Sequence, residues 1–111
     1  MMKPGVFFCN MDALSPDQRV SHREFGGQLL SALKAVRELQ DGYEFEFPLN
    51  VETYQALAQL TPLEHACCPF FDIGIRIESE SNKLCWRLTG REGIKPFIRA
   101  EFTNWFSGSG D

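Results

Sequence analysis

The sequence predicts one α+β domain, a two-layer sandwich in which helices pack on one face of a small mixed or antiparallel sheet. The chain has 111 residues, enough for one hydrophobic core but too few for two. Alternation of apolar and polar residues, typical of half-buried strands, runs through residues 43–47, 71–78 and 83–89. Apolar residues at helical spacing supply the second layer. We expect the domain to span residues 1–106, followed by a flexible Ser- and Gly-rich tail at 107–111.

The first helix is predicted to begin after Ser15 and to end at Asp41-Gly42. Ser15 is a favourable N-cap, Pro16 suits the first helical position, and Gln18 completes a capping box. The apolar stripe that follows at helical spacing consists of Phe25, Leu29, Leu33 and Val36. Gly26-Gly27 interrupts this helix at a cost of about 1 kcal/mol per glycine, which close packing against another element would explain.

The second helix is predicted to begin at the capping residue Asn50. A break or kink is expected at Thr61-Pro62, where a new capping pattern closes with Glu64. A short helical segment then runs into Cys67-Cys68, and Pro69 stops it.

The strands at 71–78 and 83–89 are predicted to form an antiparallel hairpin, because the connection at 79–82 has the length and composition of a hairpin loop. A last helix is expected after a capping box that starts at Thr89. The short apolar run at 6–9 is a candidate strand. The residues expected in the core are Phe45, Ile75, Trp86, Leu33, Leu57 and Phe97.

Composition and charge exclude several classes of function. The net charge is −4, and no basic stripe is present to meet nucleic-acid phosphates, so no nucleic-acid partner is expected. No apolar run approaches the roughly 20 residues of a membrane span, and the N-terminus lacks the apolar stretch of an export signal. We therefore expect no membrane association and a cytoplasmic location, where thiols stay reduced. There is no phosphate-binding loop, zinc-protease motif or serine nucleophile elbow, which favours a binding protein over an enzyme.

The adjacent cysteines Cys67 and Cys68 are the unusual feature of the chain. Together with Cys9 and Cys85 they are interpreted as free thiols or metal ligands and not as a disulfide framework. His65 precedes Cys68 by three residues and therefore shares its helix face, which suits a metal site or a Cys/His nucleophile. The cysteines lie at the C-terminal end of a predicted helix, where the helix dipole disfavours a thiolate. A bound cation removes this objection, so metal binding is easier to argue than catalysis.

A longer pattern resembles a known family. Its residues are Cys67-Cys68-Pro69-Phe70-Phe71, Leu88-Thr89-Gly90 with Glu92-Gly93, and Lys95, Phe97 and Arg99-Ala100-Glu101. This pattern is similar to a family of small uncharacterised bacterial proteins that carry a Cys-Cys-Pro-Phe motif between a helix and a strand hairpin. Members also tend to have an N-terminal cysteine ahead of an Arg-containing helix, as Cys9 lies ahead of Arg19 and Arg23. The resemblance covers most of residues 9–102, and it departs at Arg91, where proline is expected, and at Pro96, where a helix former is expected. It implies no particular activity.

The resemblance marks Cys9, Cys67 and Cys68 as a set, with His65 as a further candidate ligand. Thiolates select soft or borderline ions such as Hg(II), Cu(I), As(III) or Zn(II). Cys85 is expected outside the site, because its strand face carries Lys83 and Arg87. Sulfur atoms within a common neighbourhood of ~4 Å would favour metal binding.

Two alternatives stay open at this point. All the cysteines could be packing residues of a non-catalytic interaction module that self-associates, or they could serve a thiol enzyme. A homodimer is expected in which the contact patch is the aromatic C-terminal stretch Phe102, Trp105 and Phe106, because one helix face cannot bury all three rings in so small a core.

Overall fold

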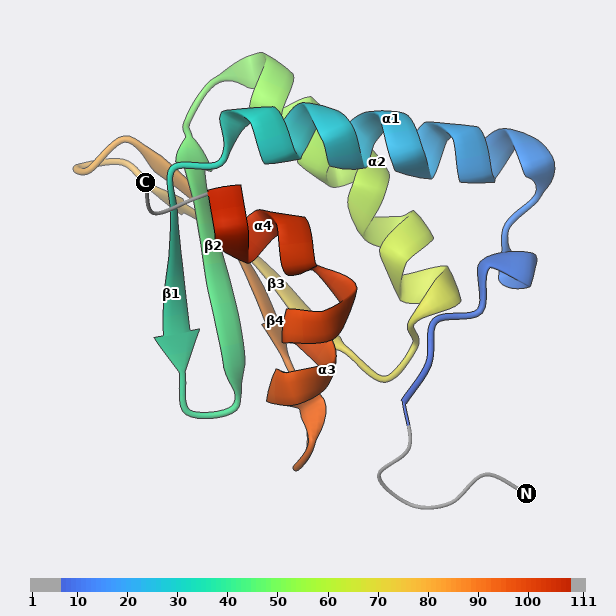
Figure 1. The fold of residues 1–111 in the computed structure, drawn as a ribbon. Coiled ribbons are helices and arrows are strands. Elements are labelled where there is room, and N and C mark those ends of the chain that lie inside the picture. Colours follow the sequence, from blue (N-terminus) through green and yellow to red (C-terminus); the bar gives the residue numbers. More distant parts are fainter. Residues whose placement is uncertain (1–6, 109–111) are drawn as a thin grey trace.

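The structure is a computed structural model that describes residues 7–108. The elements are η1 (Met11–Ala13), α1 (Pro16–Ala32), β1 (Ala35–Leu39), β2 (Gly42–Pro48), α2 (Val51–Cys67), β3 (Asp72–Glu78), β4 (Lys83–Thr89), α3 (Ile94–Glu101) and α4 (Thr103–Gly108). The strands form one antiparallel sheet in the order β1-β2-β4-β3. The α-helices all lie on the same side of this sheet (Figure 1). The predicted α+β class is confirmed.

The first helix is shorter than predicted, and a strand replaces its C-terminal part. The predicted capping box at Ser15 and Gln18 is present, but α1 ends at Ala32. The segment that follows forms β1, in which Val36 lies opposite Phe45 of β2. Pairing with a buried neighbouring strand outweighs the helical propensity of this segment, so the predicted extension of the helix to Asp41 is wrong.

The turn between β1 and β2 requires a glycine for packing reasons. A Cβ atom on Gly42 would lie 2.0 Å from the carbonyl oxygen of Leu88, because β2 and β4 approach closely at this end of the sheet. Gly42 therefore ends no helix. It is the first residue of β2.

The predicted break in the second helix is also wrong, because α2 is continuous through Pro62. Pro62 has no N–H to donate to the carbonyl of Ala58, four residues earlier. Both residues are exposed, so water can hydrate this carbonyl. Thr61 does not cap a new helix: its hydroxyl donates to the carbonyl of Leu57 at 2.7 Å and accepts a hydrogen bond from the indole of Trp86 at 3.1 Å.

The remaining elements are close to the predictions. The β3–β4 hairpin is confirmed, with Ile75 opposite Trp86. The last helical region begins after Gly93, whose φ of 94° favours glycine, so the predicted cap at Thr89 is wrong. Ser107 and Gly108 of the predicted tail are the last residues of α4, while 109–111 lie outside the described residues. Residues 7–9 of the candidate strand have no regular structure, and residue 6 lies outside the described part.

The core lies between the sheet and the helices. Phe45, Trp86 and Leu57 are fully buried as predicted, and Leu33 and Phe97 are half-buried. Ile75 is 39% exposed, so its predicted burial is wrong. The reason is its position on β3, which is an edge strand of the sheet.

The C-terminal aromatic residues belong to this core and form no exposed patch. Phe102 and Trp105 are each 8% exposed, and Phe106 is half-buried. The chain turns at Phe102 between α3 and α4, so the rings need not share one helix face. Trp105 packs edge-on against Phe45, and Phe106 packs edge-on against Tyr43. The expectation of an exposed aromatic patch is therefore wrong, and the homodimer stays a prediction.

Candidate metal centre

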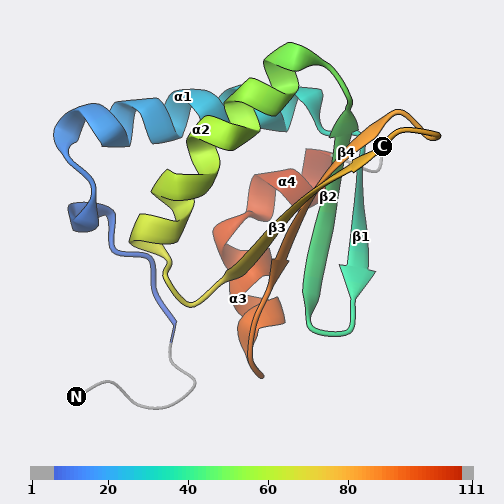
Figure 2. The ribbon, with the colours of Figure 1, turned by 180° about the vertical axis from the view of Figure 1, so that it is seen from behind.

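The inward face of α2 determines which residues reach the site. Its buried positions recur at helical spacing and are Thr53, Ala56, Leu57, Leu60, Glu64 and Cys67. Glu64 and Cys67 are thus on the same face, one turn apart, at the end of the helix nearest the N-terminal segment (Figure 2). Cys68 caps the helix through a hydrogen bond from its amide to the carbonyl of Glu64 at 2.8 Å, and Pro69 prevents its continuation.

The N-terminal segment brings Cys9 to this helix end. The amide of Asn10 donates to the carbonyl of Cys67 at 2.8 Å, and the Asn10 side chain caps η1. Arg19 of α1 donates to the carbonyl of Leu14 at 2.9 Å and so holds the connection between η1 and α1 against the helix. Phe7 packs on Phe70, two residues after the cysteine pair, with ring centroids 4.9 Å apart. These contacts position Cys9 independently of its own side chain.

The sulfur atoms of Cys9, Cys67 and Cys68 lie together. Each of them, with one carboxylate oxygen of Glu64, is within 4.8 Å of the others, and the sulfurs of Cys67 and Cys68 are 3.7 Å apart. We call these four residues the thiol cluster. For comparison, two thiolates on one tetrahedral zinc ion are about 3.8 Å apart.

Cys9 and Cys68 are joined by a disulfide bond in this structure. The expectation that both are free thiols is therefore wrong for the form described here. It failed because the spacing of cysteines along a sequence does not show which sulfurs the fold places in contact. Cys67 and Cys85 are free and buried.

The free thiol of Cys67 is held in its protonated form. Burial, together with the negative charge of Glu64, raises the pKa of the Cys67 thiol to about 12. At neutral pH this sulfur is therefore a poor nucleophile and a thiolate only when a cation replaces its proton. The arrangement suits a metal ligand better than a catalytic cysteine.

Glu64 and His22 are site residues that the sequence reasoning missed. Glu64 is only 4% exposed, and its Oε1 is 2.9 Å from Nε2 of the half-buried His22 on α1. The signal was available, because Glu64 precedes Cys67 and Cys68 by three and four residues and so shares their helix face. His65 is exposed and does not belong to the thiol cluster, because its position on α2 points it away from the buried stripe.

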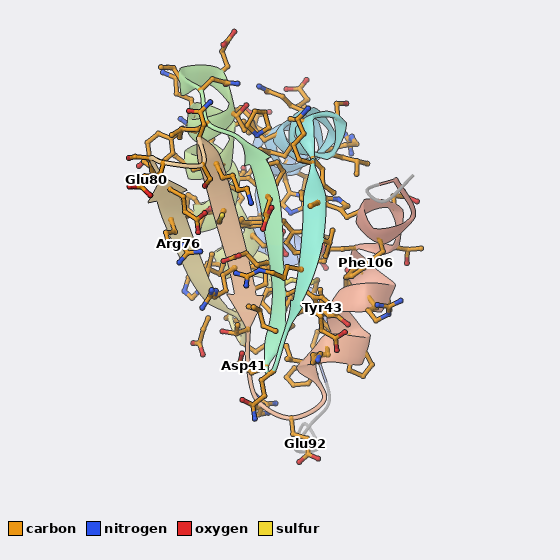
Figure 3. The ribbon with its side chains drawn as sticks, turned by 90° about the vertical axis from the view of Figure 1, so that its left-hand side faces the viewer. Asp41, Tyr43, Arg76, Glu80, Glu92 and Phe106 are labelled. Atoms are coloured by element: carbon orange, nitrogen blue, oxygen red, sulfur yellow. A yellow bond between two sulfur atoms is a disulfide. The ribbon has the colours of Figure 1, made fainter. Side chains whose placement is uncertain are left out.

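A second group of a cysteine and carboxylates lies on the outer face of the sheet, where Figure 3 shows Arg76 among the side chains of β3. Glu44, Glu46 and Cys85 offer ligand atoms within 4.8 Å of one another, and we call them the glutamate cluster. Arg37, Arg76 and Arg87 all form ion pairs with Glu44, and Lys83 lies 3.3 Å from Glu46. These cations already neutralise the carboxylates, so the group is an ion-pair network.

Comparison with known proteins adds no relative. No protein-family model, no curated protein and no solved structure matches the chain. The resemblance to the Cys-Cys-Pro-Phe family stays a prediction. No helix within residues 7–108 has the length and apolar character needed to cross a bilayer.

Proposed function

We propose that the reduced protein binds a soft metal or metalloid ion through the thiolates of Cys9, Cys67 and Cys68. The observation that carries this proposal is the convergence of three sulfur atoms from two separate parts of the chain within 4.8 Å. The Cys9–Cys68 disulfide accounts for two of these sulfurs, and the third, the buried sulfur of Cys67 at 3.7 Å from that of Cys68, is required there by neither the disulfide nor apolar packing.

Glu64 supports the proposal as a neighbouring negative charge. Its carboxylate lies within the same 4.8 Å and is an acceptable ligand for a borderline ion such as Zn(II). In the absence of a cation, Glu64 and an ionised Cys67 repel each other in a buried place, which is one cause of the raised pKa of Cys67. A bound cation turns this repulsion into attraction. His65 is a weaker candidate ligand, since it is exposed.

Binding in this proposal is gated by the oxidation state of the cysteines. The Cys9–Cys68 disulfide withholds two of the three thiolates. It must first accept two electrons from a thiol or phosphine reductant, with two protons that come from the reducing thiols or, with a phosphine, from water. In the cytoplasm, the compartment that we propose, such reduction is the normal state.

The test is a titration of the reduced and the oxidised protein with Zn(II), Hg(II) and As(III), followed by calorimetry or thiolate absorbance. We expect one ion per reduced chain and far weaker binding after oxidation. Cys67→Ser should weaken binding by at least about 10- to 100-fold, since loss of a mere outer-shell partner already has that effect. Cys85→Ser is the matched control, because Cys85 is the other free buried cysteine and lies on the opposite face of the sheet.

The proposal fails if the reduced protein binds none of these ions more tightly than glutathione does. It also fails if Cys67→Ser and Cys85→Ser have equal effects. Either result favours the alternative proposal, a non-catalytic module that self-associates, which requires a homodimer in sedimentation and no ion.

A further inference from the structure

A pocket of about 230 Å³ opens beside the thiol cluster. It lies between the N-terminal segment, α1, α2 and the chain around Phe102. Cys9 and Cys67 form part of its wall, so two of the candidate thiolates face the same space. The apolar wall residues include Leu30, Leu60, Phe102 and Trp105.

The wall contributed by α1 carries no side chain at its centre, because Gly26 and Gly27 line the pocket there. These glycines were expected to permit close packing, and that expectation is wrong. A Cβ atom added at either position would meet nothing within 4 Å outside the helix's own backbone. Packing therefore does not require glycine here, although glycine lowers helix stability. The consequence of the two glycines is an open space next to the sulfurs.

A bare ion would use the sulfurs but not this space. An apolar cavity of about 150 Å³ is large enough to hold benzene, so the pocket has room for a ring. We propose that the thiol cluster and the pocket together bind an organoarsenic(III) or organomercury(II) compound, in which the arsenic or mercury atom carries one apolar organic substituent. The soft atom bonds to the thiolates, and the substituent lies among Leu30, Phe102 and Trp105. This inference rests on the proposed function and specifies its ligand.

The binding step balances without a further redox partner once the disulfide is reduced. With phenylarsine oxide as the probe, the thiols of Cys9 and Cys67 form two As–S bonds and the As–O bonds break. The two thiol protons leave with the oxygen as one water molecule, and arsenic stays trivalent. The preceding reduction of Cys9–Cys68 takes two electrons from the added phosphine and two protons from a water molecule, whose oxygen becomes the oxygen of the phosphine oxide.

The experiment compares phenylarsine oxide with arsenite on the reduced full-length protein. Gly26→Leu places a side chain in the pocket and leaves every thiol in position. We expect it to weaken phenylarsine oxide binding about 10- to 100-fold, the effect of losing roughly 100 Å² of buried ring surface. Arsenite affinity should change by less than about twofold, because its contacts are with the thiols alone. Gly27→Leu provides a second, independent obstruction of the same wall.

Glu24→Leu is the control, since Glu24 is exposed on α1 and does not line the pocket. It should change neither affinity. The inference is overturned if both glycine variants bind phenylarsine oxide as tightly as the wild type does, or if they lose both ligands equally. Failure of the proposed function looks different, because the wild-type protein would then bind neither arsenical more tightly than a free dithiol.

Discussion

The thiol cluster and the glutamate cluster contain the same kinds of residue but differ in what surrounds them. The carboxylate of Glu44 forms ion pairs with permanently charged guanidinium groups, those of Arg87 at 3.0 Å and Arg76 at 3.7 Å. Around Glu64, the paired group is the half-buried imidazole of His22, at 2.9 Å. Proximity of ligand atoms is thus equal in the two clusters, within 4.8 Å, and does not separate them.

What separates the clusters is the balance of charge and the space beside them. The glutamate cluster is saturated by cations that the chain itself supplies, so an added ion would have to displace them. The thiol cluster has a carboxylate whose partner is one histidine, a protonated thiol and an adjoining pocket. The proposed binding at the thiol cluster therefore depends on the adjoining pocket and the absence of arginine partners there among residues 7–108, and not on a count of ligand-type residues.

The largest expected difference between the clusters concerns the covalent cross-link. The Cys9–Cys68 disulfide closes a loop with a sequence separation of 59, which corresponds to about 4 kcal/mol of unfolding free energy in the chain-entropy model. Reduction of the wild type should lower its stability in urea by about that amount. A Cys9→Ser/Cys68→Ser double variant should match the reduced protein and no longer respond to the reductant. A loss below about 1 kcal/mol would contradict a cross-linked N-terminal segment in the folded protein.

A smaller effect is expected from the charge at the centre of the glutamate cluster. Burial alone would raise the pKa of Glu44, but hydrogen bonds from Arg37 and Arg87 and their charges outweigh it and lower this pKa below 4.5. A group whose pKa is depressed in the folded state stabilises the protein above its unfolded pKa, and this contribution disappears as the pH falls through the folded value. Glu44→Gln should therefore cost about 1–3 kcal/mol at pH 7, and the gap to wild type should narrow below about pH 4.5.

The expected loss of unfolding free energy in Glu44→Gln is smaller than for a fully buried ion pair, because the arginines are about half exposed and water can solvate them. Urea unfolding at several pH values measures it, with Glu46→Gln as the milder control, since Glu46 is more exposed and pairs with Lys83. A gap that stays constant down to pH 3 would show that hydrogen bonding, and not charge, sets the role of Glu44. Metal binding at the thiol cluster should be unaffected.

The two clusters also show what the sequence could and could not predict. Strand alternation identified the outer face, because a period of two follows from backbone geometry alone. It failed for Ile75, since alternation tells which face a residue is on but not whether a helix covers that face. Likewise, β1 was missed because its pairing with β2 is a tertiary contact that outweighs local propensity.

For the thiol cluster, the sequence identified the cysteines but not their partners. Convergence of Cys9 with Cys67 and Cys68 depends on contacts distant in sequence, and so does the approach of His22 to Glu64. The sequence indicated His65 as the further ligand, whereas Glu64 is the residue with a carboxylate oxygen within 4.8 Å of the three sulfurs. Both share a helix face with a cysteine, and only the direction of the buried stripe on α2 decides between them.

The smallest expected effect is a gain in stability at the thiol side. Gly26→Ala and Gly27→Ala should each stabilise the protein by about 0.5–1 kcal/mol, because alanine is the better helix former. Outside the helix's own backbone, the added methyl group meets no atom within 4 Å at either position. Gly42→Ala is the contrasting control, since its Cβ would collide with the carbonyl of Leu88 and should destabilise the sheet. Thermal or urea unfolding of the three variants measures both signs. If the α1 variants also lose stability, the glycines serve the helix packing itself, and the pocket is a by-product of that packing and not a space kept open for a ligand.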